Sequence, residues 1–334
     1  KLEIYDLIMP ISLDTIQRIR ANDPTFTKLD TNRGLSDEHI AILYDAMTDN
    51  THLTEFNLQN NNLTDKSAEL LSKLKLITSL NLSGNKITNL GALALSNKHN
   101  LSVLDVSGNK IDKEGFKALL KLPQLSSLYI HSTAFRIDEE LELAMLNTPS
   151  LSKTDLRLSI ELELLEKIRL HDPKLTSINL ASRSLNDNHV KILCDALKNN
   201  PYVTSINLSY NKIGVESLKS LAQCSFVKTL ILNKNDYTIK MNAEYFSHLA
   251  NNVHLKTLDL NHNQITDNDI IPLSNNSTLS HLSLKANKIT KIGAQIIALM
   301  KNIIELSLSE NNIGDSGVSA FESNDTLMTL YLNG

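Results

Sequence analysis

Tryptophan is absent from this chain of 334 residues, and only two cysteines occur, Cys194 and Cys224. Two cysteines cannot form a disulfide-rich framework, so we expect both to be reduced core thiols. No apolar run approaches the length that spans a bilayer, and no signal peptide is visible, so we expect no membrane insertion. The net charge of −4 and the lack of a basic run argue against nucleic acid as a partner.

Sequence motifs of the common catalytic sites are also missing. The chain contains no H-E-x-x-H, no phosphate-binding G-x-x-x-x-G-K-[ST], no G-x-G-x-x-G and no G-x-S-x-G. His39 and His189 occupy equivalent predicted helix positions, and the Asp-rich segment 266–269 lacks the glycine and distal glutamate of a calcium loop. We therefore predict no enzyme, no catalytic residues, no cofactor and no metal site, and we interpret segment 266–269 as a helix cap.

The sequence instead contains a repeated spacing, L-x-x-L-x-L-x-x-N-x-I, that returns about every 24 residues. One copy is Ile77, Leu80, Leu82, Asn85 and Ile87. A fixed pattern at a fixed period indicates one structural unit stacked on copies of itself. The repeats that begin at Phe26, Leu125, Leu175 and Val227 are longer, and we expect their extra residues to lengthen the helix. Fourteen repeats begin at Leu2, Phe26, Leu53, Ile77, Leu101, Leu125, Leu151, Leu175, Val203, Val227, Leu255, Leu279, Ile303 and Leu327, the last one truncated.

A longer internal similarity overlies these repeats. The segment from Leu2 to Pro24 recurs 149 residues later as Leu151 to Pro173, and the match continues after a one-residue slip. This indicates a duplication, with one copy in residues 1–149 and the other in 150–334. Because Pro149-Ser150-Leu151 keeps the repeat phase, we predict a single continuous domain over residues 1–334. The chain opens without Met and ends inside a predicted strand, so we also expect a fragment or a processed form.

Each repeat predicts one strand and one helix. The L-x-L segment alternates apolar and polar residues, as in a strand with one buried face. The asparagine that follows can bond neighbouring backbone and so form a ladder between repeats. Thr133, Ser159 and Arg183 replace it, so we expect looser or differently curved stacking from 133 to 183. Helices are predicted over 37–47 with Ser36 as the cap, 65–73, 186–198 and 214–221.

Together these elements predict an α/β solenoid, a horseshoe with a parallel concave sheet and convex helices. At this point the chain resembles the leucine-rich repeat family over its whole length. The mixture of 24- and 28-residue units resembles the ribonuclease-inhibitor subclass, and Gly91-Ala92-Leu93-Ala94 is similar to the signature of GALA-type repeats in effector proteins that bacteria deliver into host cells. Extracellular members of the family carry disulfide-bonded caps, which two cysteines do not supply.

The resemblance implies a binding module. We expect the concave face to hold a protein partner over roughly 800 Å² per side, and the ribonuclease-inhibitor likeness adds that it would inhibit an enzyme by covering its active site. The effector likeness implies a bacterial protein in the cytosol of a host cell, monomeric in isolation, with a host protein or another effector as partner. Glycosylation sequons at Asn81 and Asn207 on predicted strands also favour a compartment without glycosylation.

Small polar residues cover most of the predicted concave face, so its bulky or charged residues are the candidate partner-binding positions. Three more candidates, Tyr210, Lys234 and His262, lie just past the predicted strands. Interface hot spots favour tyrosine and arginine, and we interpret Tyr129, Arg157, Tyr210 and Tyr331 as anchors. Tyr129, His131 and Arg157 form the cluster closest to the interrupted ladder. The full set is Tyr129, His131, Lys153, Asp155, Arg157, Tyr210, Lys234, Asp259, His262, His281, Lys285 and Tyr331.

Two other functions stay open. The chain could be the substrate-recognition part of a ubiquitin ligase, or a ligase adaptor, whose catalytic or F-box segment lies outside this sequence. A self-assembling structural array is the third reading, and it predicts a mass that depends on concentration.

Overall fold

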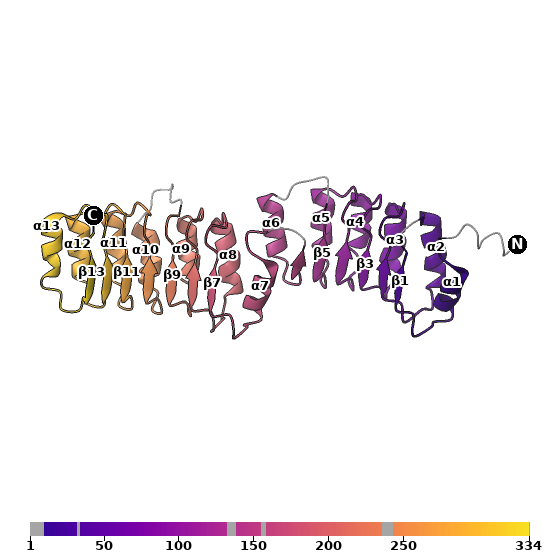
Figure 1. The fold of residues 1–334 in the computed structure, drawn as a ribbon, viewed down its shortest axis with the longest axis horizontal. Helices are drawn as coiled ribbons and strands as arrows, with labels where there is room; N and C mark the ends of the chain where they lie inside the picture. Colours follow the sequence, from indigo (N-terminus) through magenta and orange to yellow (C-terminus); the bar gives the residue numbers. More distant parts are fainter. Residues whose placement is uncertain (1–9, 32–33, 132–137, 155–157, 236–242, 334) are drawn as a thin grey trace. The chain divides into compact units, whose positions relative to one another are not determined.

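The computed structural model describes residues 10–31, 34–131, 138–154, 158–235 and 243–333. The chain divides into two compact units, residues 1–158 (unit 1) and 159–334 (unit 2). Helices and strands alternate along unit 1 (Figure 1). Its elements are α1 (Leu13–Arg20), β1 (Lys28–Asp30), α2 (Asp37–Ala46), β2 (Glu55–Asn57), α3 (Asp65–Lys73), β3 (Ser79–Asn81), α4 (Asn89–Leu95), β4 (Val103–Asp105), α5 (Lys113–Leu119), β5 (Ser127–Tyr129), α6 (Glu139–Leu146) and β6 (Lys153–Thr154).

Unit 2 repeats the same alternation and closes with a short 3₁₀ helix before its last strand. Its elements are α7 (Leu162–Arg169), β7 (Ser177–Asn179), α8 (Asp187–Ala196), β8 (Ser205–Asn207), α9 (Val215–Leu221), β9 (Thr229–Ile231), α10 (Ala243–Ala250), β10 (Thr257–Asp259), α11 (Asp267–Leu273), β11 (His281–Ser283), α12 (Lys291–Ala298), β12 (Glu305–Ser307), α13 (Gly314–Val318), η1 (Ser319–Phe321) and β13 (Thr329–Tyr331). The prediction of one continuous domain across both units stays a prediction.

Each unit contains one parallel sheet with its strands in chain order, β1 to β6 in unit 1 and β7 to β13 in unit 2. The register stacks equivalent positions, so that Leu80 pairs with Leu104 and Leu104 with Leu128. These central leucines are at most 1% exposed and pack toward the helices. The predicted α/β solenoid is therefore confirmed. The described residues hold thirteen strands, and the first of the fourteen predicted repeats begins among residues 1–9, outside the described part.

The predicted helices are present close to their predicted bounds. Helix α3 spans Asp65–Lys73, as predicted, and the helices α2 and α8 begin directly after Ser36 and Asn186. These two helices, in long repeats, have ten residues, whereas α9 in a 24-residue repeat has seven. The extra residues therefore lengthen the helix in these two repeats. In the other two long repeats the helices α6 and α10 have eight residues each, no more than some short repeats.

The asparagine ladder is also confirmed. Each ladder asparagine donates from Nδ2 to a carbonyl oxygen of the preceding repeat, and Asn85 also bonds its own repeat. Asn85 Nδ2 donates to the carbonyl oxygens of Leu82 and Leu58, both at 2.9 Å, while its Oδ1 accepts from the Leu63 N–H at 3.1 Å. One amide thus satisfies three backbone groups that the turn would otherwise bury unpaired.

A second ladder, made by aspartates, links the starts of successive helices. The Asp65 carboxylate accepts from the Thr88 N–H at 2.7 Å, from Thr88 Oγ1 at 2.6 Å and from the Gly91 N–H at 2.9 Å. A Cβ at position 91 would lie only 2.5 Å from Asp65 Oδ1, so this carboxylate position leaves no room for a side chain at residue 91. Asp37 accepts equivalent hydrogen bonds from Ser67 and Thr64 of the next repeat. Burial alone would raise the pKa of the Asp37 carboxyl, but these hydrogen bonds outweigh it and lower the pKa below its usual value. Gly91 in the GALA-like phrase therefore has a packing role.

Lys98 is a buried lysine in a position where other repeats have asparagine. The equivalent Asn50 donates to the Ile19 carbonyl at 2.9 Å and accepts from the Leu53 N–H at 2.9 Å. The Lys98 side chain is 2% exposed, and its Nζ donates to the Leu74 carbonyl and, at 3.3 Å, to Asn100 Oδ1. Burial lowers the pKa of the Lys98 ammonium from 10.5 to about 8, because the charged form loses its hydration.

We expect unit 1 to become more stable as the pH rises from about 8 toward 10.5. Over this range the unfolded chain binds more protons at Lys98 than the folded chain, because the folded pKa is the lower one, and stability then rises with pH. Lys98→Asn should raise the melting temperature at pH 7 by a few degrees and remove this part of the pH dependence. Thermal unfolding of both proteins between pH 7 and 10 measures it, and parallel pH profiles would contradict the assignment.

Candidate functional site

Strand side chains that point away from the helices form what we call the open face of each sheet. Along β3 the burial alternates, with Ser79 and Asn81 partly exposed on either side of buried Leu80. Most open-face residues in the described strands are small and polar, and their bonds stay within the sheet. Asn81 Oδ1, for example, accepts from the Ser83 N–H at 2.9 Å and from Ser83 Oγ at 2.7 Å. Larger residues on this face are therefore not required for the fold.

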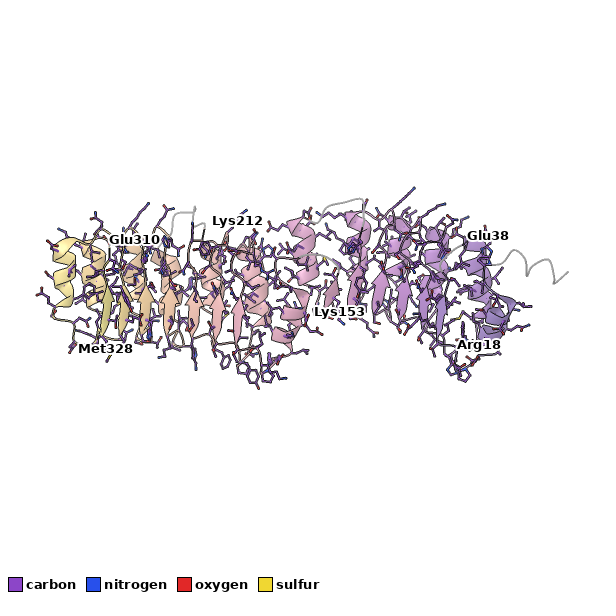
Figure 2. The ribbon with its side chains drawn as sticks, viewed as in Figure 1. Arg18, Glu38, Lys153, Lys212, Glu310 and Met328 are labelled. Carbon is purple, nitrogen blue, oxygen red and sulfur yellow. The ribbon has the colours of Figure 1, made fainter. Side chains whose placement is uncertain are left out.

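Unit 1 places Tyr129 at one end of a shallow hollow of about 230 Å³ on its open face. The hollow extends from Lys28 on β1 to Tyr129 on β5, with the carboxylates of Glu55 and Asp105 in its lining. Tyr129 is half-buried rather than fully solvent-facing, while His131 and Lys153 are exposed beyond it. Figure 2 shows Lys153 on the strand β6. The remaining members predicted here, Asp155 and Arg157, lie outside the described residues.

In unit 2 most of the predicted charged residues are already engaged by neighbours. Asp259 is half-buried, and its Oδ2 accepts from Asn233 Nδ2 at 2.9 Å. His281 Nε2 lies 3.8 Å from Glu305 Oε2, and Lys285 Nζ lies 3.0 Å from Glu310 Oε1. Tyr331, on the last strand, is 45% exposed. Exposed ion pairs of this kind contribute little to stability, so these groups can exchange partners on binding.

The predicted residues Tyr210, Lys234 and His262 share an unusual backbone conformation. They occupy the same repeat position, directly before the ladder asparagine, and their φ angles are +59°, +48° and +58°. Six consecutive repeats of unit 2 have this left-handed conformation at a residue other than glycine. We call these six residues the left-handed row: Ser182, Tyr210, Lys234, His262, Ala286 and Glu310.

A uniform hydrogen-bond pattern imposes this conformation. The backbone N–H of Tyr210 donates to the Asn233 carbonyl at 2.8 Å, and those of Lys234 and His262 donate in the same way to the next repeat at 2.9 Å. In unit 1 the equivalent residues are Asn60, Gly84 and Gly108, whose φ angles are +55°, +65° and +65°. Asparagine and glycine adopt this conformation readily, whereas other residues pay about 1 kcal/mol for it. Unit 2 therefore accepts strain that unit 1 avoids.

The strained residues also present their side chains to solvent. Tyr210 is 56% exposed, and Lys234 and His262 are exposed as well. The Lys234 ammonium lies 5.6 Å from the centre of the Tyr210 ring, within the range of a cation–π contact. In the described part of unit 2, no carboxylate forms an ion pair with Lys234. In Figure 2 Glu310, the last member of the row, and Lys212, two residues after Tyr210, lie on one edge of unit 2 and Met328 lies on the opposite edge.

The histidines that recur through the duplication have a structural role. His39 Nδ1 accepts from the Ser36 N–H at 3.0 Å, and His189 completes the equivalent capping box with Asn186. Segment 266–269 is a cap too, because Asp269 bonds the Thr266 N–H at 2.8 Å. Within the described ranges, no cluster of three or more His, Cys, Asp or Glu side chains could hold a metal ion. Over the same ranges no helix has the length and apolarity that crossing a bilayer demands.

Sequence reasoning missed the left-handed row and the aspartate ladder. The sequence does contain a sign of the row. The residue before the ladder asparagine is Asn60, Gly84 or Gly108 in the first half of the chain, whereas tyrosine, lysine and histidine stand there in the second half. The sign of the aspartate ladder is the pair Thr-Asp, which recurs at the starts of predicted helices, as at 64–65 and 266–267.

Comparison with known proteins gives one family. The model described as Leucine Rich repeat matches seven segments, residues 49–72, 73–96, 97–120, 199–222, 251–274, 275–298 and 300–321. No protein of curated function matches the sequence.

Solved structures give three likenesses. An internalin from Listeria monocytogenes is 22% identical over 97% of this chain and 96% of its own, with a TM-score of 0.38. The actin-binding site 2 of leiomodin-1 is 24% identical over 45% of this chain and 82% of its own, with a TM-score of 0.30. A mouse RP105/MD-1 complex is 18% identical over 80% of this chain and 44% of its own, with a TM-score of 0.33.

Proposed function

Because the chain is a leucine-rich repeat protein, and such repeat domains generally bind other proteins, we propose that it binds a protein partner along the open face of unit 2. Tyr210, Lys234 and His262 are the proposed anchors. Asp259, His281, Lys285 and Tyr331 form the surrounding polar surface, and Tyr129, His131 and Lys153 are a second candidate patch on unit 1.

One observation carries this proposal, the left-handed row. Backbone strain persists where the surrounding structure imposes it, and it clusters at functional sites. The unit 1 repeats place asparagine or glycine at the same position, so the fold does not require a large side chain there. An exposed tyrosine with a lysine over its ring also has the composition of an interface hot spot. These features distinguish the row from ordinary surface variation.

Replacing Tyr210, Lys234 and His262 together by glycine should abolish binding and leave the fold intact. Glycine relieves the left-handed strain, while its greater freedom in the unfolded chain offsets that gain, so we expect stability to change by no more than about 1 kcal/mol. Affinity capture from host-cell and bacterial lysates, with quantitative mass spectrometry, compares the variant with the parent protein. The partner should be depleted at least tenfold, since removing one hot-spot side chain costs about 2 kcal/mol or more.

Ala286→Gly is the matched control. It changes the same backbone position in the same row, but it removes only a methyl group. It should bind as the parent protein does. If the triple variant retains its partners, or if Ala286→Gly loses them equally, the row is not the binding surface.

Two finer roles belong to this proposal. The mixture of short and long repeats, similar to the ribonuclease-inhibitor subclass, supports inhibition of an enzyme by covering its active site. The phrase Gly91-Ala92-Leu93-Ala94 supports a bacterial effector in a host cytosol, although the packing of Gly91 against Asp65 gives that glycine a structural reason as well. A partner found in host lysate only, and inactivated by the protein in an activity assay, would support both. Capture of a bacterial partner alone would contradict the effector role.

A ligase or adaptor role is the second candidate, in which the same surface selects a substrate for ubiquitin transfer by a segment outside this sequence. The full-length gene discriminates between them. A neighbouring domain with a catalytic cysteine or an F-box would favour recruitment over inhibition.

A further inference from the structure

The only two cysteines of the chain, Cys194 and Cys224, are brought together by the stacking of two repeats. Cys194 lies in the helix α8, and Cys224 follows the end of α9, which packs beside α8. Both cysteines line one hollow beside these helices, and the Cys224 side chain is near enough to raise the pKa of the Cys194 thiol. The Cys224 thiol itself donates to the Ser220 carbonyl oxygen at 3.9 Å. Two residues thirty positions apart in sequence therefore form a dithiol pair.

A hollow gives this pair access to solvent. It has a volume of about 660 Å³, and both cysteines belong to its lining. Its lining comes from the ten-residue helix α8, the seven-residue helix α9 and the segments that follow them. Lysines and carboxylates from both helices, among them Lys191 and Glu216, make the rest of the wall polar. Cys194 is partly exposed and Cys224 is 7% exposed, so a small solute reaches Cys194 first.

Cys224 also replaces a residue that its neighbours use for bonding. The equivalent Asn200 and Asn252 are buried, and Asn252 Nδ2 donates to the Ala222 carbonyl at 3.0 Å. A cysteine cannot reproduce the two-sided bonding of the asparagine amide. The repeat that lacks this asparagine is the one whose cysteine lines the same hollow as the other cysteine of the chain.

We propose that Cys194 and Cys224 are a modification site that reacts with low-molecular-weight disulfides such as oxidised glutathione to form an intrachain disulfide. The Cys194 thiolate attacks one sulfur of the small disulfide, and one equivalent of its thiol leaves. The Cys224 thiolate then attacks Cys194 in the mixed disulfide, and the second equivalent leaves. In sum, two protein thiols are oxidised to one disulfide, one small disulfide is reduced to two thiols, and the protons are conserved.

The environment of the pair sets the rate of this exchange. The hydrogen bond with Cys224 and the burial of the side chain raise the pKa of the Cys194 thiol. The thiolate is the nucleophile, so exchange should be slow at neutral pH. While the pH is below that pKa, the rate should rise about tenfold for each unit by which the pH increases. The disulfide would close a loop of about thirty residues between α8 and the segment after α9 and would raise the melting temperature of unit 2.

The test treats the reduced, folded protein with oxidised glutathione at pH 8. Free thiols are then counted and the products are mapped by mass spectrometry, without reduction. We expect the two free thiols per chain to fall to none, with a Cys194–Cys224 cross-link, no retained glutathione and a higher melting temperature that a dithiol reductant reverses.

Cys194→Ser and Cys224→Ser are matched controls, because each keeps the fold and leaves one thiol. Cys224→Ser should accumulate a mixed disulfide at Cys194 and show no rise in melting temperature. Two thiols that stay free in the folded parent protein would overturn the proposal, as would glutathione retained on both cysteines without a cross-link. Partner capture through the left-handed row is a separate readout, so this test and that of the proposed function fail independently.

Discussion

Leu208→Asp should unfold unit 2. Leu208 is 0% exposed in the core between the strand β8 and the helices. The substitution leaves a cavity, which costs about 2 to 5 kcal/mol for a large aliphatic side chain, and it adds a buried carboxylate without a partner. The sum is comparable with the whole stability of a typical domain, about 5 to 15 kcal/mol. Circular dichroism at 25 °C should show the loss of helix signal, and Leu82→Asp should act in the same way on unit 1.

Ser205→Asp is the control for Leu208→Asp. It adds the same carboxylate to the strand β8, but on the open face, where Ser205 is partly exposed. Its melting temperature should stay close to that of the parent protein. Cooperative melting of Leu208→Asp near the parent temperature would show that the strand register is wrong, because a one-residue shift exchanges the buried and open faces.

Asn61→Ala should lower the melting temperature by roughly 5 to 15 °C. Asn61 is 6% exposed; its Nδ2 donates to the carbonyls of Leu58 and Thr31 at 3.0 Å, and its Oδ1 accepts from the Leu35 N–H at 2.8 Å. Alanine leaves these backbone groups buried and unpaired. Each such group costs about 1 to 3 kcal/mol, and partial rehydration reduces the sum to about 2 to 4 kcal/mol.

The neighbouring Asn62→Ala separates this effect from the loss of any asparagine. Asn62 is exposed, and its side chain takes no part in the ladder hydrogen bonds of Asn61. We expect its thermal unfolding to match the parent protein within about 0.5 kcal/mol. Equal destabilisation by both substitutions would mean that the ladder does not tie the repeats together.

The regular part of the fold could be predicted from sequence because many copies of one pattern together assign strands and helices that a single copy could not. A single L-x-L segment of three residues is too short to assign as a strand, but thirteen described strands in the same phase leave one consistent register. Helix starts were equally accessible, since Ser36 and Asn186 are capping residues at equivalent places. The two long helices α2 and α8 followed from the length of their repeats.

The candidate site could be predicted only in part, because it depends on backbone conformation and on contacts between repeats. Tyr210, Lys234 and His262 were found as bulky residues just past the strands, but their left-handed φ angles appear only in three dimensions. The shared hollow of Cys194 and Cys224 depends on how the ten-residue helix α8 stacks against the seven-residue helix α9. Lys98 stands where other repeats have a buried asparagine. The sequence does not indicate that its ammonium group is buried and donates to the Leu74 carbonyl.

Photo-cross-linking from position 210 tests most directly whether the left-handed row contacts a protein. A photoreactive benzoyl-phenylalanine in place of Tyr210 is illuminated in the lysate that contains the captured partner, and the same residue at Ile292 serves as the control. Ile292 is 54% exposed in the helix α12 of the same unit. We predict a discrete adduct with the partner from position 210 and none from position 292. An adduct from position 292 alone would place the partner on the helices and contradict binding at the open face.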